Sequence, residues 1–325
     1  MSDTSIRMHT LTGSNGTANA PWQPALSLTE QTSSANIRNR PVLYVHGFTF
    51  PSAMSVFWKL DGRSWADEIN SAGFSLWGLD FAGLGGSERY PEMETDTPPP
   101  VPPLGAADDA AGQVLRAVTY ILEQTGAARV AIIAHSRGSI VAGLFATRYP
   151  DLVDRLVFFG PVAERHLSSL PYGLPSTTTG LPSWRLVTIK NQYDRFVEDV
   201  PQAHPPVLLD RHFEPWARAY LATDPTSKSR HPESVKVPNG ATADIIEAWA
   251  GKLAYDPREI VRPLFIIRGE WDSFSNDEDA AWLLKAAVNA PVKRYAVTPK
   301  GTHLLLLEQG RNELYRLTNE FLMSG

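Results

Sequence analysis

The chain has 325 residues, of which 43% are hydrophobic and 20% are charged, a composition typical of a soluble globular protein with a large core. Its formal net charge of -5 gives no basic surface for nucleic acid, and the absence of cysteine excludes disulfides, thiolate metal ligands and a thiol nucleophile. No apolar run approaches the roughly 20 residues that span a bilayer, and residues 1–40 lack the apolar region of a secretory signal. We therefore expect a cytoplasmic protein without a membrane span.

The first half of the chain alternates between predicted strands and predicted helices. Residues 1–40 are polar and are predicted to form an N-terminal arm. Pro41–Val45 is a short apolar run that predicts a buried strand, and Gly73–Leu79 predicts a second one. Apolar residues recur at helical spacing through Ala106–Gln124, and Arg129–Ala134 predicts a third strand.

A serine lies at the end of that third predicted strand, in Ala134-His135-Ser136-Arg137-Gly138. A stretch rich in small residues follows and predicts a helix. Small residues flank a serine in this way where a strand turns sharply into a helix, because the tight turn leaves no room for larger side chains. Such a turn raises the serine hydroxyl above the C-terminal edge of a sheet. Ser136 is therefore the candidate nucleophile.

The alternation is interrupted after the fourth predicted strand, Leu152–Phe159. Residues 161–262 are rich in proline and aromatic residues, and predict an inserted helical cap with helices near His212–Ala222 and Thr242–Leu253. The strand and helix pattern then resumes at Pro263–Ile267 and continues to a final helix from Leu304. We expect an α/β fold with a mostly parallel sheet and helices on both faces. Residues 41–160 and 263–325 would form its core.

A serine needs a base to take its proton and an acid to orient that base. His303 is the best candidate base, because it follows the last predicted strand in a turn at the same edge of the sheet. Asp272, in the polar turn after the strand predicted at Pro263–Ile267, is the candidate acid, with Glu164 as the alternative. None of the histidines shows a recognisable metal-ligand spacing, so we expect no metal.

A developing oxyanion needs preorganised donors, which are usually backbone N–H groups. The sequence predicts two, the N–H of Arg137 directly after the nucleophile and the N–H of Phe48 after His46-Gly47. Aromatic residues suggest an apolar substrate pocket, although core packing would explain most of them equally well. The residues that we assign to this pocket are His135, Trp58, Trp184, Trp216 and Trp271.

With these residues in place, the chain from about Arg40 to its C-terminus resembles the α/β-hydrolases. The resemblance rests on five motifs, in this order: Val45-His46-Gly47-Phe48, residues 79–87, residues 134–138, residues 268–272 and Gly301-Thr302-His303. It implies a capped, mainly parallel sheet of about eight strands, no cofactor, and acylation of Ser136 followed by attack of water with His303 as general base. Because relatives that act as haloalkane dehalogenases or epoxide hydrolases use an aspartate nucleophile, Ser136 disfavours those activities.

These features favour an esterase-like or lactonase-like serine hydrolase that acts on a hydrophobic small molecule. An amide substrate is also compatible with them. An acyltransferase with the same three residues is the first alternative, and a small-molecule receptor with little turnover is the second. The oligomeric state stays open.

Overall fold

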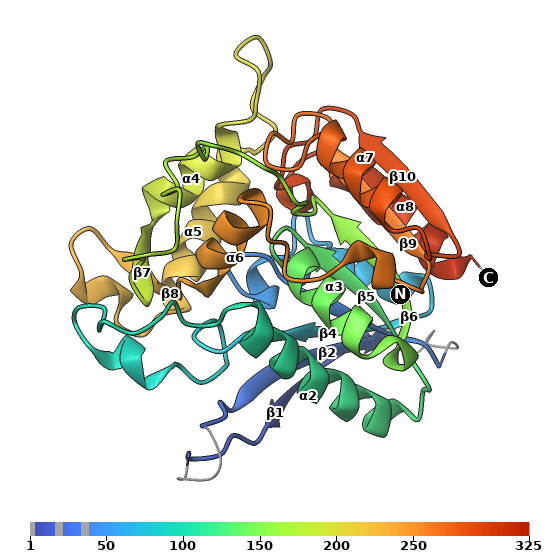
Figure 1. Cartoon of the computed structure of the whole chain (residues 1–325), viewed down its shortest axis with the longest axis horizontal. Helices are drawn as coiled ribbons and strands as arrows, with labels where there is room; N and C mark the ends of the chain where they lie inside the picture. The colour runs from blue at the N-terminus through green and yellow to red at the C-terminus, as the bar shows by residue number, and fades with distance from the viewer. Residues whose placement is uncertain (1–3, 17–21, 34–38, 325) are drawn as a thin grey trace.

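An eight-stranded sheet runs through the protein, in the order β1-β2-β4-β3-β5-β6-β9-β10 (Figure 1). The computed structural model describes residues 4–16, 22–33 and 39–324. The strands of the sheet are β1 (Thr4–Leu11), β2 (Leu26–Ser33), β3 (Pro41–Val45), β4 (Ser75–Leu79), β5 (Val130–His135), β6 (Val153–Phe159), β9 (Leu264–Gly269) and β10 (Lys293–Thr298). The six strands from β3 onward pair in parallel, whereas β1 and β2 pair antiparallel. This sheet confirms the predicted fold class.

The chain reverses its direction across the sheet at β3. It passes first to β4 on one side of β3, and later to β5 on the other side. The loops that follow β3 and β5 therefore separate at the carboxyl ends of two neighbouring parallel strands. In open α/β sheets, this is the place where a crevice for ligands forms.

Alternate residues of the central strands pack into two hydrophobic cores, one on each face of the sheet. Leu43 and Ile132 face one core, and their neighbours Tyr44 and Ile133 face the other, because successive side chains of a strand point to opposite faces. Helices α2 (Ala107–Thr125), α3 (Gly138–Arg148) and α7 (Asp277–Ala286) cover the first face; α1 (Trp65–Ser71) and α8 (Arg311–Met323) cover the second. No helix in the described part of the chain is long and apolar enough to cross a membrane.

The N-terminal segment, predicted to be a polar arm, contributes two strands to the sheet. Its two described strands, β1 and β2, extend the sheet, and β2 pairs with β4 along Leu28–Gln31. Leu26 and Leu28 are buried at this edge, whereas most of β1 is exposed. The prediction missed these strands because only two of the eight β2 residues are strongly apolar. Residues 1–3, 17–21 and 34–38 of the predicted arm lie outside the described residues.

Between β6 and β9 the chain leaves the sheet and forms a separate group of elements, drawn from yellow-green to orange and mostly on the left of Figure 1. We call residues 161–262 the insertion. Its elements are β7 (Trp184–Thr188), α4 (Ile189–Val197), α5 (Asp210–Ala222), β8 (Ser234–Pro238) and α6 (Gly240–Trp249). Helices α5 and α6 lie where the sequence predicts helices of the insertion, and the strands β7 and β8, which pair antiparallel, are additional to them. Both strands contain valine, whose branched side chain favours extended backbone.

Short 3₁₀ turns connect several elements: η1 (Ser52–Met54), η2 (Pro91–Glu94), η3 (Pro150–Leu152), η4 (Ser227–Ser229), η5 (Pro257–Glu259) and η6 (Leu305–Leu307). The turn η6 lies where the sequence predicts the start of the final helix. The final helix begins at Arg311 instead of Leu304, because Thr302 binds the carboxylate of Glu308 and the chain folds back between them.

Candidate active site

Ser136 lies between β5 and α3, in the sharp turn that the sequence predicts. Its φ angle is +54°, a left-handed conformation that costs energy for any residue other than glycine. The Ser136 amide donates a hydrogen bond of 2.9 Å to the Phe159 carbonyl oxygen, which anchors the turn to β6. A Cβ atom at Gly138 would lie 2.5 Å from the Val45 carbonyl oxygen. Position 138, where the start of α3 contacts the end of β3, therefore requires glycine.

His303 links Ser136 to Asp272. The Ser136 Oγ atom lies 2.8 Å from His303 Nε2, and His303 Nδ1 lies 2.9 Å from Asp272 Oδ2. All three residues are buried. An ionised carboxylate only accepts hydrogen bonds, so Nδ1 carries the ring proton and Nε2 can accept the proton of the serine hydroxyl. The three residues predicted from sequence are thus brought into one hydrogen-bonded relay.

Gly160 makes room for this relay, and sequence reasoning missed it. The residue follows β6 with a φ angle of +55°, and a Cβ atom there would lie 3.0 Å from both Asp272 Oδ2 and His303 Nδ1. The second carboxylate oxygen of Asp272 accepts a hydrogen bond of 2.8 Å from the Ser275 amide. Both oxygens of Asp272 are therefore fixed. The signal in the sequence was a glycine directly after a buried strand.

The loop that carries His303 is held by a second buried acid, Glu308. Its carboxylate accepts hydrogen bonds from the amide and the hydroxyl of Thr302, the residue before His303. Burial raises the pKa of Glu308 to about 7, because a low-dielectric surrounding disfavours the charged form. Within the part of the chain that the structure describes, the Glu308 carboxylate forms no hydrogen bond with Ser136 or His303. It is a positioning residue for the loop.

Of the residues with the two predicted oxyanion donors, Phe48 lines the same cavity as Ser136, and Arg137 directly follows Ser136 in the chain. Among the described residues, neither amide donates a hydrogen bond to another protein atom. A Cβ atom at Gly47 would lie 3.0 Å from the Cβ atom of Ser136, so glycine allows the Phe48 loop to approach the serine. Both amides are thus available to a ligand at Ser136.

Two further buried histidines, His46 and His135, lie beside the relay. Burial lowers the pKa of His46 to about 3 and the pKa of His135 well below its ordinary value. His46 Nε2 accepts a hydrogen bond of 3.2 Å from the Phe81 amide, which ties the Phe48 loop to the loop after β4. His135 Nε2 lies 3.0 Å from the His303 carbonyl oxygen. Both histidines hold loops in place, and His303 is the histidine that contacts the hydroxyl of Ser136.

A cavity of about 330 Å³ opens beside Ser136. The core and the insertion both contribute to its wall. The described residues that line it are Phe48, Thr49, Phe50, His135, Ser136, Phe274, His303 and Leu304 from the core, and Arg185, Leu186, Val187, Asn191, Gln192 and Arg195 from the insertion. Of the residues predicted for the substrate pocket, only His135 is among them.

The four tryptophans predicted for this pocket lie elsewhere, which corrects that prediction. Trp184 and Trp216 are buried in the two cores, and their Nε1 atoms donate to the carbonyl oxygens of Glu92 and Met54. Trp58 packs against the second core, and the ring of Trp271 lies 4.7 Å from that of His204. Core packing therefore accounts for most of these aromatic residues.

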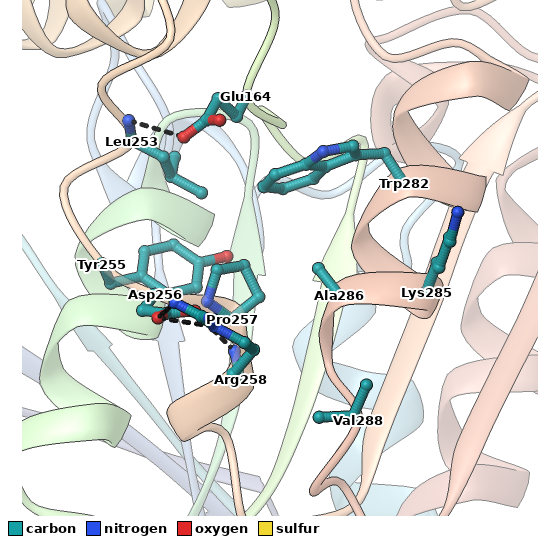
Figure 2. Close-up of a pocket in the computed structure, with 10 residues that line it drawn as sticks. All are labelled: Glu164, Leu253, Tyr255, Asp256, Pro257, Arg258, Trp282, Lys285, Ala286 and Val288. Carbon is teal, nitrogen blue, oxygen red and sulfur yellow. Dashed lines mark hydrogen bonds and ion pairs between the residues drawn. The ribbon is translucent and has the colours of Figure 1, made fainter.

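The alternative acid, Glu164, lies away from His303. Figure 2 shows it in another pocket, of about 610 Å³, opposite Trp282. Its carboxylate accepts a weak hydrogen bond of 3.4 Å from the Leu253 amide, and the Arg165 amide binds the Ala248 carbonyl oxygen. The chain after β6 thus turns toward the end of α6, which carries Glu164 away from the relay. Asp272, and not Glu164, contacts His303.

A family model of the α/β-hydrolase fold matches residues 40–309. Together with the eight-stranded sheet and the strand-to-helix turn at Ser136, this match shows that the chain belongs to the α/β-hydrolase fold family. No curated protein sequence matches the chain.

Several solved structures are similar to it over nearly the whole length. A serine hydrolase, CCSP0084, from the polyaromatic hydrocarbon-degrading bacterium Cycloclasticus zankles is 15% identical, with a TM-score of 0.63 and 98% of each chain covered. A structure from work on carboxylesterases of the thaumarchaeon Nitrososphaera gargenis is 14% identical to the chain, with a TM-score of 0.62. The match covers 96% of this chain and 97% of the other. A 2-hydroxy-6-oxo-6-phenylhexa-2,4-dienoate hydrolase from Rhodococcus sp. strain RHA1 is 14% identical, with a TM-score of 0.61 and 98% and 100% coverage. At these identities the likeness concerns the fold.

Proposed function

We propose that the protein is a serine hydrolase that cleaves a carboxylic ester or lactone of a small hydrophobic molecule through an acyl-enzyme on Ser136. The observation that carries this proposal is the buried relay from Asp272 through His303 to Ser136, with distances of 2.9 Å and 2.8 Å. Nucleophile, base and orienting acid within hydrogen-bond reach are the recognisable geometry of an activated serine.

In the first step, Ser136 Oγ attacks the carbonyl carbon while His303 Nε2 takes the hydroxyl proton. The carbonyl oxygen becomes an oxyanion, which the amides of Phe48 and Arg137 stabilise by hydrogen bonds. The bond from carbon to the leaving oxygen then breaks, and His303 returns its proton to the departing alcohol. Asp272 stays ionised and stabilises the imidazolium that forms in between.

In the second step, a water molecule attacks the acyl-enzyme while His303 takes a proton from it. The bond between the acyl carbon and Ser136 Oγ breaks, and His303 gives the proton back to the serine. The products are a carboxylic acid and the free enzyme. An amide could enter the same cycle, with an amine in place of the alcohol.

The cavity supports a small substrate and a capping role for the insertion. Its volume of about 330 Å³ lies near the lower end of the range for ligand pockets, about 300–1,000 Å³. Phe48, Phe50 and Phe274 give it apolar walls. Because six of its fourteen lining residues come from the insertion, we propose that residues 161–262 cap the serine and exclude water from the reaction.

The test is the hydrolysis of 4-nitrophenyl butyrate by the purified full chain. We expect turnover by the wild type and a kcat about 10⁶-fold lower in Ser136→Ala, because removal of the nucleophile leaves only residual catalysis. Ser169→Ala, which changes an exposed serine of the insertion outside the cavity, should behave like the wild type. Hydrolysis that persists in Ser136→Ala would contradict the proposal.

A further inference from the structure

Two arginines of the insertion line the cavity beside Ser136, and their charges are compensated differently. Arg195, in α4, forms ion pairs with Glu198 and with Asp199, the latter at 3.3 Å. These two carboxylates offset its positive charge. The second arginine is Arg185, in β7.

Arg185 has no acidic partner among the described residues: no carboxylate oxygen lies within 4.0 Å of its guanidinium. Instead, the guanidinium lies over the ring of Phe48, 4.6 Å from the ring centroid. The residue is half-buried, and this burial lowers the pKa of Arg185 from its ordinary value. A cation that has lost part of its hydration without gaining a counter-ion is unfavourable. An anionic ligand in the cavity would relieve that cost.

The position of Arg185 relates this anion site to the reacting bond. Phe48 carries the guanidinium on its ring, and its own amide is a proposed oxyanion donor. Arg185, Phe48 and Ser136 thus line one cavity, so one ligand could contact both the guanidinium and the serine. Asn191 adds a polar amide on the same wall, while Leu186 and Phe274 are apolar. The cavity thus contains one arginine, Arg185, without a carboxylate partner among the described residues, and six of its fourteen lining residues are apolar.

We propose that the substrate is an ester that bears a carboxylate, and that Arg185 binds this carboxylate while Ser136 attacks the ester carbonyl. The proposal rests on the proposed serine hydrolase function. A single uncompensated guanidinium presents a planar pair of N–H donors, which matches the two oxygens of a carboxylate. A phosphate dianion would bring twice the charge to this one cation, so the carboxylate is the better match.

The experiment compares two pairs of esters that differ in one carboxylate. Mono(4-nitrophenyl) glutarate and 4-nitrophenyl pentanoate place the charge on the acyl side; 4-carboxyphenyl pentanoate and phenyl pentanoate place it on the alcohol side. We expect the wild type to prefer the charged ester of at least one pair in kcat/KM by about tenfold to a hundredfold, the range for hydrogen bonds to a charged group. The preferred pair identifies which side of the ester faces Arg185.

Variants then assign this preference to Arg185. In Arg185→Met, which keeps the length of the side chain but removes its charge, the ratio of kcat/KM within the preferred pair should fall to about one. Arg185→Lys should retain part of the preference. Lys190→Met is the matched control, because Lys190 is an exposed cation of α4 that pairs with Asp194 outside the cavity. It should leave the ratio at the wild-type value.

Equal kcat/KM values within both pairs, with hydrolysis that still depends on Ser136, would overturn the carboxylate proposal alone. Failure of Ser136-dependent hydrolysis with all four esters would overturn the proposed function itself. Inhibition of the wild type provides a measurement that needs no folded variant: pentanoate should inhibit hydrolysis of the neutral ester at lower concentration than pentanamide. Equal inhibition by these two compounds, or stronger inhibition by butyl phosphate, would contradict carboxylate recognition by Arg185.

Discussion

Asp272 is connected to Ser136 through His303. Its Oδ2 atom lies 2.9 Å from His303 Nδ1, and the Ser275 amide fixes its other oxygen. The carboxylate thereby selects the ring tautomer in which Nε2 faces Ser136. Orientation and tautomer are the two properties of the base that depend on this one side chain.

We predict that Asp272→Asn lowers kcat by about 10⁴-fold, because the amide favours the wrong tautomer of the base while it keeps the shape of the site. The measurement is steady-state hydrolysis of 4-nitrophenyl butyrate. Glu164→Gln is the matched control, since Glu164 lies in the separate pocket of Figure 2, and should leave kcat unchanged. A large loss in the Glu164 variant, with an active Asp272→Asn, would reverse the assignment of the acid.

Site residues that directly follow a strand could be predicted from the sequence, whereas site residues whose position depends on distant contacts could not. Ser136, Asp272 and His303 each follow a strand of one parallel sheet, so their meeting at one edge could be expected. Arg185 could not be assigned in this way, because its place in the cavity depends on how the insertion folds over Phe48. The tryptophans misled the prediction, since large aromatic side chains fill cores as readily as they line pockets.

The segment between β10 and α8 connects the base to the rest of the fold. It contains His303, the turn η6 and Glu308, which binds Thr302 from the far end of the turn. The protonation state of Glu308 is therefore coupled to the stability of the whole segment. The pKa of this carboxyl is about 7 in the folded protein, against 4.5 as its ordinary value.

We predict that this carboxyl makes the wild type less stable as the pH rises. The folded protein holds the proton more tightly than the unfolded chain, so its contribution is complete below pH 4.5 and is lost as the pH rises through about 7. Relative to Glu308→Gln, the wild type should lose on the order of 2 kcal/mol of unfolding free energy between roughly pH 5 and pH 8. Urea unfolding at several pH values measures this difference.

Glu123→Gln, on the exposed side of α2, serves as the control and should reproduce the wild-type dependence on pH. Parallel curves for the wild type and Glu308→Gln would show that Glu308 does not change its protonation between these pH values. In that case the buried acid would not account for the stability of the His303 segment.

Elements with a strong apolar pattern could be predicted from the sequence, and elements without one could not. β3 and β5 are buried apolar runs, and both were expected close to their observed bounds. β1 is mostly exposed, and β2 depends on Leu26 and Leu28 for its buried face. Their pairing at the edge of the sheet is set by a long-range contact with β4 that no local pattern reports.

For the whole molecule, the insertion supplies part of the wall of the cavity beside Ser136. The sheet brings Ser136, His303 and the Phe48 loop together, and the insertion adds Arg185 and Arg195 to the lining of the cavity. The chemistry would thus come from the sheet, and the selection of the substrate from the insertion. The sequence predicts this division, because regular alternation of strands and helices stops at residue 161 and resumes near residue 263.

The central claim is that Ser136 is an activated nucleophile. The most direct test is labelling of the wild type, Ser136→Ala and His303→Ala with a fluorophosphonate probe, with the modified residue mapped by mass spectrometry. We predict that the wild type alone is labelled and that the label is on Ser136, because the serine needs His303 to take its proton. A wild type that stays unlabelled, or a label on another residue, would contradict this account of the site.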